Sequence, residues 1–470
     1  MLLACIACGI LVPSLPLQAN RLIVLTDIEA EVDDTESMVR LMLYSNEIDI
    51  EGLIATTSCW KRSGVAPESI QRVISAYGRV QPNLKKHDAG FPEAAALAAK
   101  VKRGSAKYGM EGVGDGKDSE GSDWILRVLD EKDDRPLWIS VWGGANTLAQ
   151  ALYKIQKTRS PADAERLIAK LRVYTISDQD DSGVWIRRTF PRLFYIVSPG
   201  DDYGTATWNA ITTVVDGIDN SKISNRWLAE NVQQNHGPLG AEYPDVAYGM
   251  EGDTPSWLNL IPNGLSDPEH PDWGGWGGRY ELLKPVFDPG MKGGSGVPHE
   301  AETREIWTDA ADVCTPSLPA EFGRAIQPGK QSFRGNKVSL WRWRDEFQND
   351  FAARMTWCTK PFAEANHPPV PRLNQPDTIT VHSGDGFVLD AAGTTDPDGD
   401  SLSFLWFNYP EAGSYKQPIP IGSAENMRWV YVKAPVVDKP ATSHFILKVT
   451  DKGNPPMTRY RRVIVTVLPR

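Results

Sequence analysis

Residues 26–37, TDIEAEVDDTES, follow directly on the apolar run LIVL at residues 22–25. Within residues 26–34 the chain places five acidic side chains, Asp27, Glu29, Glu31, Asp33 and Asp34. Like charges this close repel one another by about 1 kcal/mol or more per pair in a partly buried setting. A bound cation is the usual compensation for such repulsion. The stretch therefore predicts a buried strand that ends at a cation site.

The sequence around this stretch, up to about residue 230, alternates between short β-branched runs and longer helical patterns. Because strands separated by helices pair in parallel through right-handed crossovers, the alternation predicts an α/β fold with a doubly wound, mostly parallel sheet. Ligands bind at the carboxyl ends of the strands in such a sheet, where the acidic stretch lies. The predicted strands are residues 21–26, 50–57, 137–142, 171–177 and 193–197, and the predicted helices are residues 34–44, 67–77 and 145–155.

The chain has 470 residues, more than a single core usually serves, so we expect at least two domains. The proline-rich stretch ANHPPVPRLNQP at residues 365–376 predicts a linker between them. Beyond it, short alternating strands with turn signals predict an all-β sandwich of immunoglobulin or cadherin type. The expected domains are residues 20–364, whose last helix is predicted at 337–357, and residues 377–470, with strands at 378–381, 386–390, 402–407, 444–450 and 461–468.

Residues 1–19, MLLACIACGILVPSLPLQA, carry no charge and end in a small-residue cleavage pattern. They predict a signal peptide and therefore a secreted or periplasmic protein. The alternatives are a buried N-terminal segment and a lipoprotein attached through Cys5. An oxidising compartment would permit Cys314 to pair with Cys358. No later apolar run approaches the ~18 residues of a membrane helix.

The formal net charge of −10 disfavours nucleic acid and anionic membranes as partners. The 16 tryptophans are many for this length, and tryptophan stacks well on sugar rings. The motifs of serine hydrolases, P-loop NTPases and dinucleotide enzymes do not occur, nor does a His or Cys cluster at metal spacing. Oxygen ligands alone favour Ca²⁺ or Mg²⁺, and a carboxylate beside such a cation favours hydrolysis. Carbohydrate is the expected partner, and the oligomeric state stays open.

Two further turns follow predicted strands at the same edge of the sheet. GGANT at residues 143–147 carries Asn146, and SDQDDSG at residues 177–183 carries Asp178 and Asp181. Each is also compatible with an ordinary strand-to-helix connection, and Asp34 with a plain helix N-cap. An N-cap explains one carboxylate and leaves the others unexplained, which favours the cation.

Residues 104–122 and 236–300 have little periodicity, and loops of this length are usually lids or binding segments. The second contains MEGDTPSW at 250–257 and HPDWGGWGGRY at 270–280. The tryptophans beside glycines predict a platform for a sugar ring, with core packing as the alternative. The candidate substrate contacts in this region are His236, Trp257, His270, Trp273 and Trp276.

The turn DPDGD in the C-terminal domain spaces Asp396, Asp398 and Asp400 as a calcium loop does. The same residues make a good turn without any metal. A second metal site and a plain turn are both open at this point.

The stretch at residues 26–34 resembles the calcium-binding aspartate cluster of nucleoside hydrolases, in which an aspartate ends the first strand and a pair opens the next helix. GGANTLA at residues 143–149 is similar to the Gly-Pro-Leu-Thr-Asn turn of that family, and Asp253 to its late aspartate. With GDTPSWL at 252–258 and WGGWGGRY at 273–280, nearly all of residues 20–470 resembles bacterial secreted proteins described as cellulose-binding. Those proteins have a nucleoside-hydrolase-like N-terminal domain and a cadherin-like C-terminal domain.

The resemblance implies a role for each matching residue. Asp27 would be a calcium ligand and the base that activates water, and Asp33 would hold a sugar hydroxyl. The further calcium ligands would be Asp34, Asp253 and the backbone carbonyl of Asn146.

Two departures from nucleoside hydrolases stand out. Five residues rather than three separate the first aspartate from the pair, and Gly252 stands where the family often has a histidine that protonates the base. A proton would then come from elsewhere, for example from His236 or His270.

These observations predict a secreted, calcium-dependent glycoside hydrolase acting on a plant-type or other environmental glycan, with Asp27 and Asp33 as catalytic residues. The alternatives are a non-catalytic polysaccharide-binding protein and an extracellular nucleoside hydrolase.

Overall fold

The structure is a computed structural model of the whole chain. It describes residues 18–199, 207–285, 296–297, 300–318, 327–328, 331–422 and 425–470. The predicted signal peptide therefore lies, except for its last two residues, outside the described residues. Within them, no helix has the length and apolarity needed to cross a bilayer.

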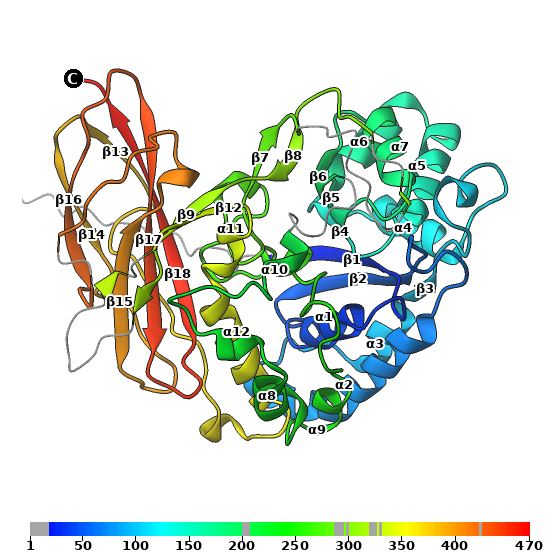
Figure 1. Cartoon of the computed structure of the whole chain (residues 1–470), viewed down its shortest axis with the longest axis horizontal. Coiled ribbons are helices and arrows are strands. Elements are labelled where there is room, and N and C mark those ends of the chain that lie inside the picture. The colour runs from blue at the N-terminus through cyan, green and yellow to red at the C-terminus, as the bar shows by residue number, and fades with distance from the viewer. Residues whose placement is uncertain are drawn as a thin grey trace, which may run out of the picture.

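An eight-stranded sheet forms the centre of the N-terminal part (Figure 1). Its strands pair in parallel, except that the edge strand β7 runs antiparallel to β8. This arrangement confirms the predicted α/β fold class. In order across the sheet, the strands are β3 (Val101–Arg103), β2 (Ile48–Ala55), β1 (Asn20–Thr26), β4 (Leu137–Val141), β5 (Leu171–Ser177), β6 (Phe194–Ser198), β8 (Ile306–Asp309) and β7 (Tyr280–Leu283).

Helices cover both faces of this sheet, as the alternation of side chains along β1 requires. Leu22 and Val24 point into the core beneath α1 (Asp33–Met42) and α2 (Pro67–His87). Ile23 and Leu25 point into the opposite core. The helices on that side are α4 (Glu120–Asp130), α5 (Asn146–Thr158), α6 (Pro161–Lys170) and α7 (Ser182–Thr189).

The predicted last helix of the first domain is two helices. α11 (Val338–Trp341) ends before Arg342 and Trp343, and α12 (Arg344–Thr356) begins after them. The long segment at 236–300 also contains short helices, α9 (Gly237–Ala241) and α10 (Pro255–Leu258), before it enters β7. The remaining α-helices are α3 (Ala94–Ala99) and α8 (Asn225–Leu228).

The C-terminal part consists of two sheets that pack face to face. A four-stranded sheet contains, in order, β13 (Thr378–His382), β18 (Thr458–Leu468), β17 (Ala441–Asp451) and β15 (Leu402–Asn408). A two-stranded sheet pairs β14 (Gly386–Asp390) with β16 (Trp429–Lys433). One apolar core, which includes Leu389, Val430, Trp406 and Leu447, lies between the sheets and confirms the predicted sandwich. The remaining strands form two short antiparallel pairs, β9 (Asp312–Cys314) with β12 (Phe333–Gly335) and β10 (Ser317–Leu318) with β11 (Gln327–Pro328).

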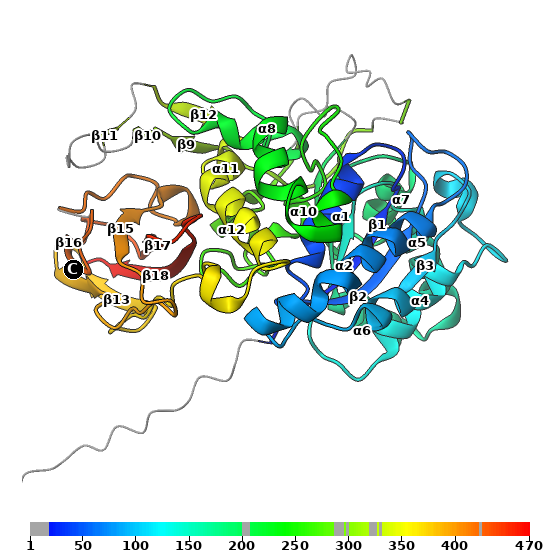
Figure 2. The same cartoon turned by 90° about the horizontal axis from the view of Figure 1, so that it is seen from below.

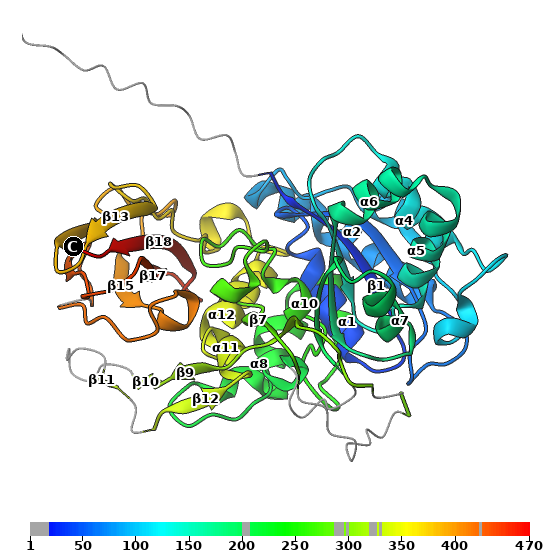
Figure 3. The ribbon, with the colours of Figure 1, turned by 90° about the horizontal axis from the view of Figure 1, so that it is seen from above.

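The two parts are joined through a shared core. Figures 2 and 3 both place α11 and α12 between the sandwich and the parallel sheet. Trp343 packs against Tyr409 and Tyr460 of the sandwich, with ring centroids 6.0 and 5.9 Å apart. The predicted linker also packs, since the backbone oxygen of Asn366 accepts a hydrogen bond of 2.8 Å from the Trp357 indole.

Cys314 and Cys358 are both free cysteines in the structure. The pairing of Cys314 with Cys358 that an oxidising compartment would permit is therefore absent from the structure. Cys358 is buried in the core of the N-terminal part, whereas Cys314 lies on β9 beside Phe333 and Val215.

Candidate active site

Two segments, the β1–α1 connection and the turn before α10, bring four aspartates together at the carboxyl ends of the central strands. Asp27 follows β1, Asp33 and Asp34 open α1, and Asp253 lies in the turn before α10. One carboxylate oxygen each from Asp33, Asp34 and Asp253 lie within 4.8 Å of one another. All four side chains are buried, with 3–5% of their surface exposed. The structure therefore agrees with the sequence prediction that carboxylates gather at this edge of the sheet.

Burial and mutual repulsion make ionisation of this cluster costly. Burial, followed by the charge of Glu31, raises the pKa of Asp33 to about 7. Burial and the neighbouring aspartates raise the pKa values of Asp34 and Asp253 well above 3.8. Burial also raises the pKa of Asp27, against the opposing effects of the Ser58 hydroxyl and the Lys61 charge. A positive charge among these carboxylates would relieve the repulsion.

The protein compensates other buried carboxylates with arginine. Asp350 pairs with Arg354 and Arg459, and Asp312 pairs with Arg279 and Arg342. In the described residues, none of the four clustered aspartates forms an ion pair with lysine or arginine, whereas those two do. The cluster therefore lacks the compensation that the same chain supplies elsewhere.

Polar neighbours fix the carboxylates and leave oxygens for a ligand. Asp34 accepts a hydrogen bond from the Thr26 hydroxyl, and Asp33 accepts one of 3.0 Å from the Trp208 indole. The Oδ2 atom of Asp253 is buried and has no hydrogen-bond partner. An unpaired buried carboxylate oxygen beside other carboxylates suits a hard cation with oxygen ligands. The residues present therefore fit calcium.

The turn between β4 and α5 touches the cluster through its glycines. A Cβ atom on Gly143 would lie 2.6 Å from Oδ1 of Asp27. Only a residue without a side chain allows the turn to approach Asp27 this closely. The side chain of Asn146, the predicted carbonyl ligand, is turned to Thr56 and Thr57, with hydrogen bonds of 2.8 and 2.9 Å. A ligand role for its backbone carbonyl stays a prediction.

The turn after β5 uses its aspartates differently from the sequence prediction. Asp178 accepts two hydrogen bonds of 2.8 Å from Arg187, so this carboxylate is committed to an ion pair rather than to a substrate. Asp181 accepts a hydrogen bond of 2.8 Å from the backbone N–H of Met110. Between them, Asp180 is buried with its Oδ2 unpaired, and burial raises its pKa to about 6.

The predicted tryptophan platform is wrong for Trp257 and Trp276, because both side chains are fully buried. Trp257 packs against Tyr44, with ring centroids 5.7 Å apart. Trp276 packs against Phe347 and Tyr460. The core-packing alternative holds for these two residues.

Two further predicted contacts face the C-terminal sandwich. His270 stacks on Trp273, with ring centroids 4.0 Å apart, and Trp273 in turn makes an edge-to-face contact with His444 of β17.

His236 is nearly buried at the start of α9, and burial lowers its pKa. In the described residues, His270 contacts Trp273 and His236 contacts the backbone of Gln234, so neither contact involves the aspartate cluster, where a proton donor was predicted.

Sequence reasoning missed several neighbours of the cluster. Ser58 and Lys61 follow β2 at the carboxyl edge of the sheet, so the strand-end rule could have found them. The half-exposed Trp60 lies between them in sequence and its backbone N–H donates to Ser58. Trp208 carried no signal in the sequence. Its indole occupies the space beside Gly252 into which any side chain at 252 would extend.

Comparisons with known proteins agree with this geometry. The family model described as cellulose-binding Sde182, nucleoside hydrolase-like domain, matches residues 21–280. The chain belongs to this Sde182 family. The family's second model, the C-terminal domain of cellulose-binding protein Sde0182, matches residues 386–467. The predicted resemblance is thereby confirmed.

A solved structure also resembles the whole chain. It is a nucleoside hydrolase-related hypothetical protein from Saccharophagus degradans that is associated with carbohydrate metabolism. The two sequences are 35% identical, the match covers 96% of this chain and 100% of the other, and the TM-score is 0.79. No curated protein matches the sequence. At the coarse level, this Sde182-family protein has a hydrolase-type domain and belongs to a family associated with carbohydrate.

Proposed function

We propose that this Sde182-family protein is a secreted, calcium-dependent glycoside hydrolase that acts on an environmental, plant-type glycan. The observation that carries the proposal is the buried group of Asp33, Asp34 and Asp253, whose carboxylate oxygens lie within 4.8 Å of one another, with Asp27 close enough for its charge to raise their pKa values. Among the described residues, these aspartates have no arginine partner, and Oδ2 of Asp253 has no hydrogen-bond partner. Such a cluster suits a cation that activates water. A nucleoside hydrolase-like domain in a family named for cellulose supports a sugar substrate.

Each aspartate has a role in this proposal. Asp27, Asp34 and Asp253 would hold calcium, which supplies positive charge for an attacking water and for neighbouring sugar hydroxyls. Asp27 would accept the proton of that water at its carboxylate. The Ser58 hydroxyl and the Lys61 charge both favour the ionised form of Asp27, which a base requires.

Asp33 would bind a sugar hydroxyl. Its Oδ2 already accepts the Trp208 indole N–H, which fixes the orientation of the carboxylate.

The leaving group needs a proton donor, and Gly252 cannot supply one. Asp180 is the group we assign to this step. Its Oδ2 lies against Gly144, next to the Gly143 that touches Asp27, and its pKa is raised to about 6. A carboxyl with that pKa is protonated often enough near neutral pH to act as an acid.

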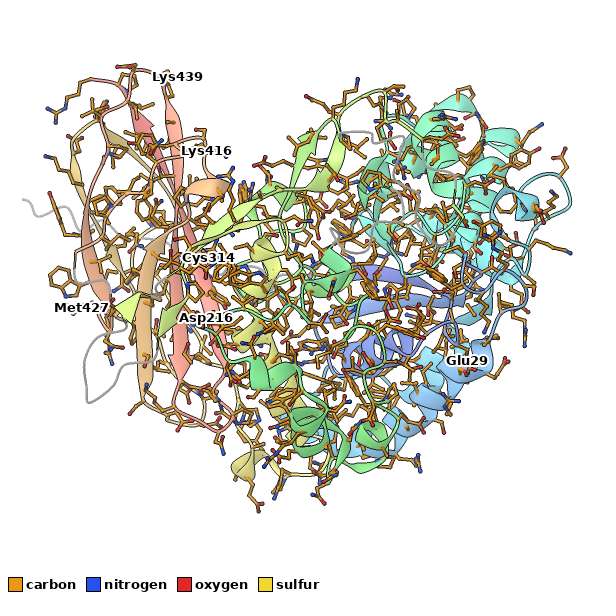
Figure 4. All side chains as sticks on the ribbon, in the orientation of Figure 1. Glu29, Asp216, Cys314, Lys416, Met427 and Lys439 are labelled. Carbon is orange, nitrogen blue, oxygen red and sulfur yellow. The ribbon has the colours of Figure 1, made fainter. Side chains whose placement is uncertain are left out.

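Substitution Asp27→Asn tests the proposal. It keeps the size of the side chain and removes the base and one calcium ligand. We expect the rate of glycoside hydrolysis to fall by about 10²–10⁴-fold with the fold retained by circular dichroism. Asp216→Asn, an exposed aspartate labelled in Figure 4 far from Glu29, serves as the matched control with unchanged rate.

The substrate panel should contain plant polysaccharides, aryl glycosides and nucleosides. Full activity in Asp27→Asn would contradict the assigned base. Base release from nucleosides alone would replace the glycan with a nucleoside as substrate.

A second candidate, non-catalytic polysaccharide binding, rests on a different surface. Trp429 and Tyr431 alternate on β16 and are 53% and 58% exposed, and Val388 of β14 pairs with Tyr431. With Met427 they form an exposed apolar face of the sandwich. Figure 4 labels Met427 and Glu29 on opposite sides of the molecule, so this face is separate from the aspartate cluster.

Aromatic rings on a flat sheet suit the face of a glucan chain. We expect the double substitution Trp429→Ala/Tyr431→Ala to weaken binding to insoluble cellulose at least tenfold, without a change in unfolding temperature. Val436→Ala removes an exposed side chain of the same domain and is the control. Unchanged cellulose binding in the double variant would exclude this face as a glucan site.

The predicted boundaries belong to the same proposal. We assign residues 1–19 to export, residues 20–364 to the catalytic domain, residues 365–376 to the connection, and residues 377–470 to a sandwich that positions the catalytic domain or contacts glycan.

A further inference from the structure

We propose that a second cation, calcium by its chemistry, binds at the junction between the N-terminal part and the sandwich. Its ligands are side-chain oxygens of Asp396, Asp398, Asp400, Asp451 and Asn366. The first three belong to the loop between β14 and β15, Asp451 ends β17, and Asn366 belongs to the proline-rich connection. The sequence offered only the loop aspartates for such a site, and the structure adds the other two.

The loop holds its three carboxylates together. Oδ1 of Asp396 accepts the backbone N–H groups of Asp398 and Asp400, at 2.9 and 3.0 Å. One oxygen from each of the three aspartates then lies within 4.8 Å of the others. These hydrogen bonds explain the loop conformation and do not yet require a ligand.

Two buried side chains supply the independent observation. Asp451 is 1% exposed and Asn366 is 5% exposed. Oδ1 of Asp451 accepts three N–H groups, from Gly453, Met457 and the Asn366 amide, at 2.9–3.0 Å. Those bonds fix both side chains, and they leave Oδ2 of Asp451 and Oδ1 of Asn366 buried without any partner.

A third buried oxygen, Oδ2 of Asp396, is also unpaired. The backbone N–H of His367 donates a hydrogen bond of 2.7 Å to Asp398. Because Asn366 directly precedes His367, it lies next to the loop. Hydrogen bonds therefore connect Asp451 to the loop through Asn366 and its neighbour His367, and the unpaired oxygens of Asp396, Asp451 and Asn366 belong to this connected group.

In the described residues, none of the aspartates Asp396, Asp398, Asp400 and Asp451 pairs with lysine or arginine, and the ring Nδ1 of His367 lies 2.9 Å from Oδ1 of Asp398. Asp350, a buried aspartate on the other side of the same junction, has two arginines. Unpaired buried oxygens destabilise the folded state, and a bound cation would relieve that cost.

The ligand set selects the ion. Five oxygens, four of them from carboxylates, match the 6–8 oxygen ligands of Ca²⁺ once waters or carbonyls complete the shell. Mg²⁺ prefers fewer protein ligands and a strict octahedron, and Zn²⁺ prefers nitrogen and sulfur.

The ion would tie the two parts of the protein together. It joins the connection to two loops of the sandwich. His367 stacks on Phe362 at 3.7 Å and its ring nitrogen meets that of His87, at the end of α2, at 2.9 Å. Calcium at this place would therefore stiffen the contact between the sandwich and α2.

Calcium counting on the chain from residue 20 tests the proposal. Equilibrium dialysis against ⁴⁵Ca²⁺ should give two ions per wild-type chain. Asp396→Asn/Asp400→Asn should remove one ion, and Asp438→Asn, an exposed aspartate of the same domain, should remove none. The second ion should persist in Asp34→Asn, which alters the active-site cluster.

An ion count that is the same in wild type and in Asp396→Asn/Asp400→Asn would overturn the site. The unfolding temperature gives a second readout. Calcium should raise it in Asp34→Asn, and this rise should be lost when the two loop substitutions are added. A calcium-induced rise that survives those substitutions would also overturn the proposal. Because the two sites are altered separately, failure here leaves the proposed hydrolysis untouched, and the reverse also holds.

Discussion

Buried aspartates in this protein fall into two groups at the scale of single residues. Asp350 and Asp312 each pair with two arginines, and they hold the structure together. Among the residues that the structure describes, the active-site aspartates and Asp451 lack such partners, and Asp253 and Asp451 each keep an unpaired oxygen. Arginine therefore pairs with the buried carboxylates that have a structural role, and the other buried carboxylates remain available to bind cations.

The titration of Asp180 gives the first prediction. Burial raises its pKa from 3.8 to about 6, so the folded state holds a proton that the unfolded state releases between these values. The stabilising contribution is complete below pH 3.8 and is lost as the pH rises through about 6. It amounts to about 3 kcal/mol at most.

Urea unfolding of wild type and Asp180→Asn, at pH 4 and pH 7 in EDTA, measures this contribution. The stability of wild type minus that of the variant should fall with rising pH, because asparagine does not titrate. Parallel pH profiles for the two proteins would show that Asp180 has an ordinary pKa.

Sequence reasoning located the aspartates well and the tryptophans poorly. Asp27, Asp33 and Asp34 were predictable because strand ends and helix starts are readable from periodicity. Trp257 and Trp276 were not, because a glycine-rich sequence does not say whether a neighbouring tryptophan faces water or Tyr44 and Tyr460. Trp208 reaches Asp33 only through the tertiary fold.

At the scale of elements, the strands of the parallel sheet agree with the sequence prediction more closely than the helix at 337–357 and the strands of the sandwich do. The predicted strands of the parallel sheet are present within a few residues, since buried parallel strands have clear apolar runs. The single predicted helix at 337–357 is divided at Trp343, which turns into the sandwich interface. β16 was missed, although WVYVK at 429–433 alternates as a strand does.

Gly143→Ala tests the close approach of the turn between β4 and α5 to the Asp27 carboxylate. The new Cβ would lie 2.6 Å from Oδ1 of Asp27, so the carboxylate or the turn must move. We expect calcium affinity at the active site to fall at least tenfold and hydrolysis to fall with it. Gly335→Ala, where nothing lies within 4 Å of the new atom, is the control. Wild-type calcium affinity in Gly143→Ala would mean that Asp27 is not a ligand.

At the scale of the whole molecule, the two parts share one apolar core, so we expect them to unfold as one unit. Met457 and Tyr460 of the sandwich belong to the same apolar cluster as Leu22 and Val24 of the parallel sheet. The proline-rich connection, which composition alone marks as a linker, is packed through Asn366 and His367. Composition could not show this because the partners lie far away in sequence.

Arg459→Met tests the junction. Arg459 donates a hydrogen bond of 2.6 Å to the fully buried Asp350. Loss of Arg459 leaves this carboxylate with Arg354 and the Tyr44 hydroxyl, both of which bond its other oxygen. We expect a loss of about 3 kcal/mol in a single cooperative calorimetric transition. Arg461→Met, two residues along β18 and more exposed, should change stability little. Two separate transitions in wild type would contradict the single folding unit.

The most direct measurement is product release from the glycoside panel by the wild-type chain, first in calcium, then in excess EDTA, then with calcium restored. The account predicts release in calcium, its loss in EDTA and its return on adding calcium back. Release that continues in EDTA, or no release from any glycoside by folded, calcium-loaded protein, would contradict calcium-dependent hydrolysis at the aspartate cluster.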